Sequence, residues 1–141
     1  KTITDGIRNP DHADTRQSIM PAFGRDQLLT PQQVDDVVAH VRVISHQGKP
    51  NDAARRGAQL FADNCAVCHG AGGEGGRQFG APKLTDAIWL FGGDYARLVE
   101  TVHNARYGVM PAWQGRLTEA QIRAVSAYVR GLGGGEAPPA E

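Results

Sequence analysis

Several features are scarce in this sequence of 141 residues. Aromatic residues make up only 6% of it, which is little for the core of a domain of this size. Lysine plus arginine and aspartate plus glutamate balance at 15 each, so no basic excess indicates a nucleic-acid partner. No run approaches the ~20 apolar residues of a membrane span, and no signal peptide opens the chain. The length accommodates one ordinary domain or two small ones.

The only two cysteines lie in a single five-residue run, Cys65-Ala66-Val67-Cys68-His69. This C-x-x-C-H spacing is typical of covalent haem c, because two thiols add across the haem vinyl groups and the adjacent histidine becomes an axial ligand. A thioredoxin-like pair would need a βαβ setting, and a structural zinc site would need a second cysteine pair. A plain disulfide leaves the histidine unexplained. The run favours haem c, which would also supply the apolar surface that aromatic residues do not.

The chain repeats part of itself. Residues 19–23 read I-M-P-A-F and residues 109–113 read V-M-P-A-W. Each segment is followed by Leu-Thr and a helical pattern, in which Thr30 and Thr118 are expected N-caps with Gln33 and Gln121 as capping-box partners. Such self-similarity predicts duplicated domains.

The two copies are unequal, and this sets the predicted domain organisation. No cysteine precedes Met20, and a haem motif equivalent to that of the second copy would fall before residue 1. Residues 1–50 are therefore predicted to be the C-terminal part of a first haem domain, 51–132 a complete one, and 133–141 a flexible Gly/Pro tail. The alternative is an ordinary helical extension with a coincidental M-P-A match. The abrupt start favours a processed or cropped piece of a longer chain.

The predicted complete domain opens with a helix to about residue 64. Gly57 and Phe61 share one face of it, and Tyr128 on the last helix is their expected partner. The glycine-rich residues 72–76 lack the strand and helix of a phosphate-binding loop and are expected to pass closely by the haem. Residues 88–91 are an apolar run, and Asp94 is the expected cap of a third helix.

Met110 is the predicted sixth iron ligand, because a thioether is a soft donor and Pro111 keeps it on a loop. His103 is the rival ligand, although its place beside the apolar stripe of its helix favours a solvated or propionate-side role. The Pro82 carbonyl can accept from the ring N–H of His69, which would fix the histidine tautomer; a plain loop proline is the alternative. Trp113 is a candidate for packing on the haem edge, and equally for an ordinary core role.

Residues 51–135 resemble class I cytochrome c domains in their first helix, C-A-V-C-H, Pro82, M-P-A-W and last helix. A closer resemblance is to the di-haem subunit (CcoP, also called FixP) of cbb-type haem–copper oxidases. The phrases that carry it are G-A-P-K-L at 80–84, I-W-L-F-G-G at 88–93 and V-M-P-A-W at 109–113, with G-I-R-N, D-T-R-Q-S and M-P-A-F-G in residues 6–24. The departures are the missing first haem motif and membrane anchor, so Met20 would have no haem of its own unless a missing segment or another chain supplies one.

This resemblance implies an all-α, class I cytochrome c fold around one covalent haem c. It also implies a periplasmic electron-transfer domain, not an enzyme on its own, which passes electrons from a soluble cytochrome c to the core subunits of a membrane-anchored oxidase. Val67, Ala112 and Trp113 are expected at the exposed haem edge. A free-standing cytochrome c shuttle is the alternative. A di-haem peroxidase or dehydrogenase would need an open iron or a second cofactor, and a haem-based sensor would need Met110 to detach.

Overall fold

The computed structural model describes residues 1–76 and 78–133. Within these residues the chain forms helices and loops and no strand. The helices are α1 (Thr2–Asp5), α2 (Pro31–Ile44), α3 (Asp52–Asn64), α4 (Ala66–His69), α5 (Tyr95–Asn104) and α6 (Glu119–Gly131). The predicted all-α fold class is confirmed. Of the predicted tail, residues 134–141 lie outside the described part of the chain.

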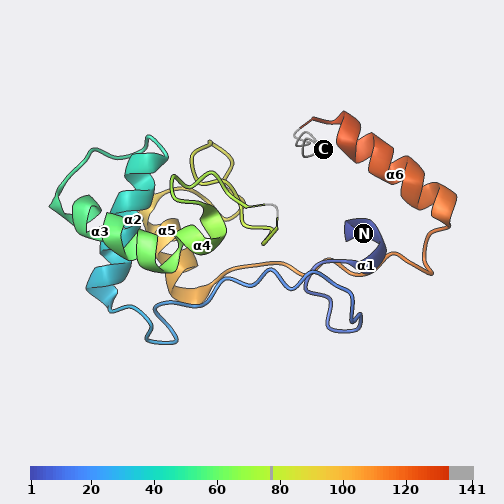
Figure 1. Cartoon of the computed structure of the whole chain (residues 1–141), viewed down its shortest axis with the longest axis horizontal. Coiled ribbons are helices and arrows are strands. Elements are labelled where there is room, and N and C mark those ends of the chain that lie inside the picture. Colours follow the sequence, from blue (N-terminus) through green and yellow to red (C-terminus); the bar gives the residue numbers. More distant parts are fainter. Residues whose placement is uncertain (77, 134–141) are drawn as a thin grey trace. The chain divides into compact units, whose positions relative to one another are not determined.

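The chain divides into two compact units. The first unit combines Lys1–Gln17 with the chain from Gly108 onward, and so contains α1 and α6 (Figure 1). The second unit is Ser18–Tyr107 and contains the other helices. The domain boundary predicted between residues 50 and 51 falls inside this second unit. The structural units therefore cut across the sequence repeats, and each unit is described separately below.

The starts of α2 and α6 follow the predicted capping boxes. The Thr30 side chain accepts from the Gln33 N–H at 3.3 Å, and the Gln33 side chain accepts from the Thr30 N–H at 2.9 Å. Thr118 and Gln121 form the same pair of bonds with the same distances. These bonds satisfy donors that a helix start leaves free, so both helices begin where the sequence predicts.

The core of the second unit forms where α2 packs on α3, with α5 beside them (Figure 1). Its buried apolar residues are Phe23, Leu29, Val34, Val37, Val38, Val41, Phe61, Cys65, Leu98 and Val102. Gly57 lies so close to α2 that a Cβ there would collide with the Asp36 carbonyl oxygen. The ring of His40 lies 5.2 Å from that of Phe61. The sequence predicts that Tyr128 packs against Gly57 and Phe61 of α3. In the structure α2 packs there instead, and the residue in contact with Phe61 is His40, which corresponds to Tyr128 in the sequence repeat.

In the first unit, the residues that follow α1 pair with the M-P-A-W segment. Ile7 and Met110 exchange backbone hydrogen bonds of 3.0 and 2.9 Å, and the Trp113 N–H donates to the Ile3 carbonyl at 3.1 Å. Gly6, with φ of 76°, allows this close approach, because a Cβ there would collide with the Met110 carbonyl oxygen. The described part of α6 has no buried residue.

Candidate haem site

The C-x-x-C-H run lies at the junction of α3 and α4. Cys65 ends α3, its N–H donating to the Phe61 carbonyl at 2.8 Å, and it also begins α4. The N–H groups of Cys68 and His69 both return to the Cys65 carbonyl, at 3.1 and 2.9 Å. This single tight turn holds both thiols and the imidazole on one short stretch of backbone, and both cysteines are free thiols. The arrangement fits covalent attachment of a group that presents two vinyl carbons.

The environment of Cys65 argues against a reactive redox pair. Its side chain is buried, and the residue is only 8% exposed. Burial, with a smaller contribution from Cys68, raises the pKa of the Cys65 thiol to about 11. Disulfide oxidoreductases depend on the opposite shift, since the thiolate is their nucleophile. A thioredoxin-like role is therefore disfavoured by the environment as well as by the absence of strands in the described residues.

His69 is oriented by the loop that follows it. Its Nδ1 lies 3.0 Å from the Pro82 carbonyl oxygen, which is the hydrogen bond expected from the sequence. A carbonyl oxygen can only accept, so the proton must lie on Nδ1 and the lone pair on Nε2. A hydrogen bond of this kind to the outer nitrogen orients an imidazole and raises its basicity as a metal ligand. Nε2 is thus the ring nitrogen available to a metal ion.

The glycine-rich loop brings Pro82 to this position. Gly76 and Ala81 exchange backbone hydrogen bonds of 3.1 and 3.0 Å, and the Leu84 N–H donates to the Gly73 carbonyl at 2.7 Å. Gly75 has a φ of 83°, and a Cβ on it would lie 2.9 Å from the Lys83 nitrogen. Only glycine fits there without strain, which explains the close wrapping predicted for this loop.

Large apolar side chains of the second unit are exposed. Val67 lies within α4, and Ile88 and Leu90 are 81% and 86% exposed. Ile19, Phe79 and Phe91 are also exposed. So many exposed apolar groups in one small unit mark a binding surface. They suit a large, flat, apolar ligand such as a porphyrin, so the residues present fit haem c.

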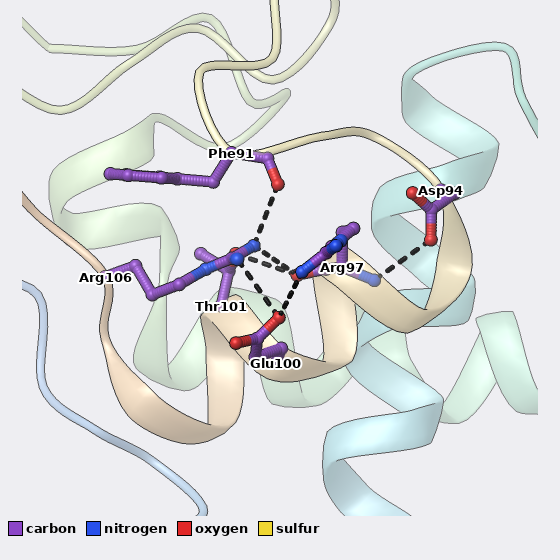
Figure 2. Close-up of polar contacts among 6 residues, drawn as sticks. All are labelled: Phe91, Asp94, Arg97, Glu100, Thr101 and Arg106. Carbon is purple, nitrogen blue, oxygen red and sulfur yellow. Dashed lines mark hydrogen bonds and ion pairs between the residues drawn. The ribbon is translucent and has the colours of Figure 1, made fainter.

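Arg106 holds the loop that carries part of this apolar surface, and sequence reasoning missed it. Its guanidinium donates to the Phe91 carbonyl at 3.0 Å, to Glu100 at 3.0 Å and to the Thr101 hydroxyl at 2.7 Å, and lies 5.1 Å from the centre of the Phe91 ring (Figure 2). Asp94 accepts from the Arg97 N–H at 3.1 Å, as expected of a cap. No local pattern marks Arg106, because its partners come together only when the loop folds back onto α5.

The structure distributes the other candidates between the two units. Cys65, Cys68, His69 and Pro82 come together in the second unit, whereas Met110 and Trp113 belong to the first. His103 is exposed at the end of α5, with its Nδ1 3.1 Å from the Asn104 side-chain oxygen, as expected of a solvated histidine. The methionine that shares a unit with His69 is Met20.

Comparison with known proteins identifies the family. A family model described as "Cytochrome C oxidase, cbb3-type, subunit III" matches residues 52–129, more than half of the chain. The chain belongs to this family. The match to subunit III runs from the start of α3 to near the end of α6, and so includes the whole C-x-x-C-H turn and its Pro82 loop.

Individual relatives extend the match to subunit III over most of the chain. A protein of Cereibacter sphaeroides named "Cbb3-type cytochrome c oxidase subunit CcoP" is 56% identical over 135 residues, which cover 96% of this chain and 47% of that protein. A CcoP of Rhodobacter capsulatus is 49% identical, covering 95% and 48%. A FixP of a Bradyrhizobium species is 47% identical, covering 96% and 47%. The chain thus spans about half the length of the curated relatives it matches.

Of the helices in residues 1–76 and 78–133, none combines the length and apolar character needed to cross a bilayer.

Proposed function

We propose that this chain carries one covalent haem c, bound to Cys65 and Cys68, and relays single electrons through it. The observation that carries the proposal is the α3–α4 turn, where two free thiols and an imidazole with a fixed tautomer share a few residues of backbone. Haem c, when bound, supplies an iron that alternates between ferrous and ferric states. The family match to an oxidase subunit III is in accord with this chemistry.

The residues around the motif have distinct tasks in this proposal. His69 donates its Nε2 to iron, and Pro82 holds the ring through Nδ1. A methionine sulfur would be the second protein ligand of the iron, which would favour its ferrous state. The sequence assigns that ligand to Met110, with Trp113 against the haem edge. Two protein ligands would leave the iron no site for oxygen, which would favour outer-sphere electron transfer.

The relatives' names set the proposed physiological context. The CcoP and FixP relatives are named as subunits of cbb3-type cytochrome c oxidase. We infer that this chain serves a parent protein of the same kind, anchored in the inner membrane, with the haem domain in the periplasm. A soluble cytochrome c would donate electrons, and the oxidase core subunits would accept them. The chain is then an electron-transfer domain without catalytic activity of its own.

A direct test is haem analysis of the chain matured in a cell that attaches haem c. Pyridine haemochrome absorption, combined with the intact protein mass, is expected to give one haem per chain held by two thioether bonds. Cys65→Ala and Cys68→Ala should each leave a single thioether. Stopped-flow mixing with reduced cytochrome c and with a cbb3 oxidase should then show electron entry and exit. A correctly matured chain that remains colourless would refute the proposal.

An unlinked electron shuttle is the alternative that this test separates. A shuttle would exchange electrons with several partners at similar rates, whereas an oxidase domain should favour the cbb3 core. Trp113→Ala probes the proposed haem edge. Unchanged exchange with both donor and oxidase would remove Trp113 from that role.

A further inference from the structure

The second unit joins pieces of both sequence repeats. Its haem-bearing half, α3 to α5, belongs to the second repeat, whereas residues 18–44, with Met20 and α2, belong to the first. Each repeat has its own M-P-A segment and following helix, so the haem-bearing half has two possible partners in one chain. The structure has selected the one that comes earlier in sequence.

Residues 18–25 are fixed to the haem-bearing half at both ends. The Ser18 hydroxyl donates to the Phe79 carbonyl, within the loop that positions Pro82. The Arg25 N–H donates to the His103 carbonyl at 2.9 Å, and Phe23 is buried in the core. Met20 lies between these anchors. It is half-buried and packs against the same core as Ala66 of α4 and Leu84 of the Pro82 loop.

Polar contacts on α3 and α5 distinguish α2 from α6. Arg56 of α3 makes two hydrogen bonds, 2.8 and 2.7 Å, to the carboxylate of Asp36, which is only 3% exposed. Tyr95 of α5 donates to Asp35 at 2.7 Å.

The repeat alignment places other residues at the matching positions of α6. Ala124 stands where α2 has Asp36, and Arg123 stands where it has Asp35. An α6 docked in the same way would offer Arg56 no carboxylate and Tyr95 no acceptor. Arg56 and Tyr95 are both exposed, so water would replace these partners, but α6 would lack the charge-assisted bonds that α2 makes, and these contacts favour α2.

The first unit has the complementary arrangement. Its α1, with the sequence T-I-T-D, resembles the T-V-H-N that ends α5, and each is followed by a residue of positive φ, Gly6 at 76° and Ala105 at 57°. The Ile3 and Thr4 carbonyls accept from the N–H groups of Trp113 and Gln114 at 3.1 and 3.2 Å. In both units, therefore, the helix end of one repeat binds the M-P-A segment of the other.

We propose that the two repeats exchange their methionine-bearing halves within this chain, so that Met20 is the sixth ligand of the iron bound by His69. This inference rests on the proposed haem c site and replaces the sequence-based choice of Met110. Residues 18–44 are then the second half of a working haem domain. Met110, held by Ile7 in the first unit, is left for a haem-bearing half of the first repeat.

The test compares Met20→Leu with Met110→Leu in the haem-loaded chain. Leucine keeps the volume of methionine but removes the sulfur, so the protein should still fold. Met20→Leu should abolish the near-infrared charge-transfer band of methionine-ligated ferric haem and lower the reduction potential. Met110→Leu should leave both unchanged. Thermal unfolding of both variants by circular dichroism reports whether any loss reflects unfolding instead of ligand loss.

The opposite pattern, with the band lost only in Met110→Leu, would overturn the exchange and leave the proposed electron-transfer function intact. A band retained in both variants would also overturn it, since the iron would then bind whichever methionine remains. Failure of the proposed function itself would appear in the wild-type chain, as a lack of covalent haem.

A second measurement does not depend on the ligand. In the ferrous haem-loaded chain, nuclear Overhauser effects are expected from Gly57 to Asp36 and Val37, whose backbone atoms are the ones that a Cβ at Gly57 would meet. Effects from Gly57 to α6 in place of α2 would overturn the exchange.

Discussion

Helices α2 and α6 share one sequence pattern but differ in how much of each helix is buried. Both begin at a threonine in a capping box, and both have an apolar stripe at helical spacing. Five residues of α2 are buried, whereas no described residue of α6 is, and Tyr128 is 68% exposed. The comparison shows that caps and periodicity define a helix but do not determine what covers it.

The differences lie on the buried face of α2. Asp36 meets Arg56, Val38 is fully buried and His40 contacts Phe61. The corresponding residues of α6 are Ala124, Ser126 and Tyr128. An alanine and a serine give α6 neither the charge nor the apolar volume that α3 accommodates. Three substitutions of this kind are enough to distinguish two helices of similar pattern.

The largest expected effect comes from placing a side chain in the close contact between α2 and α3. Gly57→Ala places a methyl group against the Asp36 carbonyl, so it should lower the free energy of unfolding by about 3 kcal/mol. The matched control is Gly131→Ala at the end of α6, where nothing lies within 4 Å and alanine should change stability by no more than about 0.5 kcal/mol. Urea unfolding of the haem-loaded chain measures both. Equal effects at the two glycines would contradict the asymmetry.

A smaller effect is expected from exchanging the side chains at one matching position. Val38→Ser removes apolar contacts from a fully buried site and introduces a hydroxyl, at a cost of about 2 kcal/mol. Ser126→Val on exposed α6 should change stability by no more than about 0.5 kcal/mol. Denaturant midpoints of the two variants give the comparison. A larger loss in Ser126→Val would indicate that α6 is the buried copy.

The smallest expected effect is in the pH dependence. The hydrogen bonds from Arg56 lower the pKa of Asp36, and burial opposes this only in part. A lowered carboxylate pKa contributes stability above the unfolded value of about 3.9, which is lost as the pH falls through the folded pKa. Unfolding of the wild type should therefore become easier below about pH 4.

Asp36→Asn should reduce the loss of stability at acid pH, which is the acid limb of the stability curve, because an amide does not titrate. Asp63→Asn, at an exposed aspartate on α3, is the control and should leave it unchanged. An identical acid limb in wild type and Asp36→Asn would rule out this ion pair as its source.

Much of the site could be predicted from the sequence because its signals are local. The C-x-x-C-H run, the caps at Thr30, Asp94 and Thr118, and the Pro82 carbonyl each concern contacts over short sequence distances or a strongly constrained motif. Arg106 and the Arg56–Asp36 pair could not be predicted in this way. The partners of Arg106 lie on α5 and on the loop before it, and no motif marks them. Arg56 and Asp36 meet only after α3 has packed on α2.

By itself, the sequence determined that the chain is helical, where each main helix begins, and that one short turn carries two thiols and a histidine suited to haem c. It also determined that two methionine-bearing halves exist. Only the tertiary structure decided which half packs on α3, because that selection depends on buried charge and volume at positions that have the same apolar period in both copies. The two repeats give α2 and α6 nearly the same local sequence pattern, so packing between distant segments decides which of them covers α3.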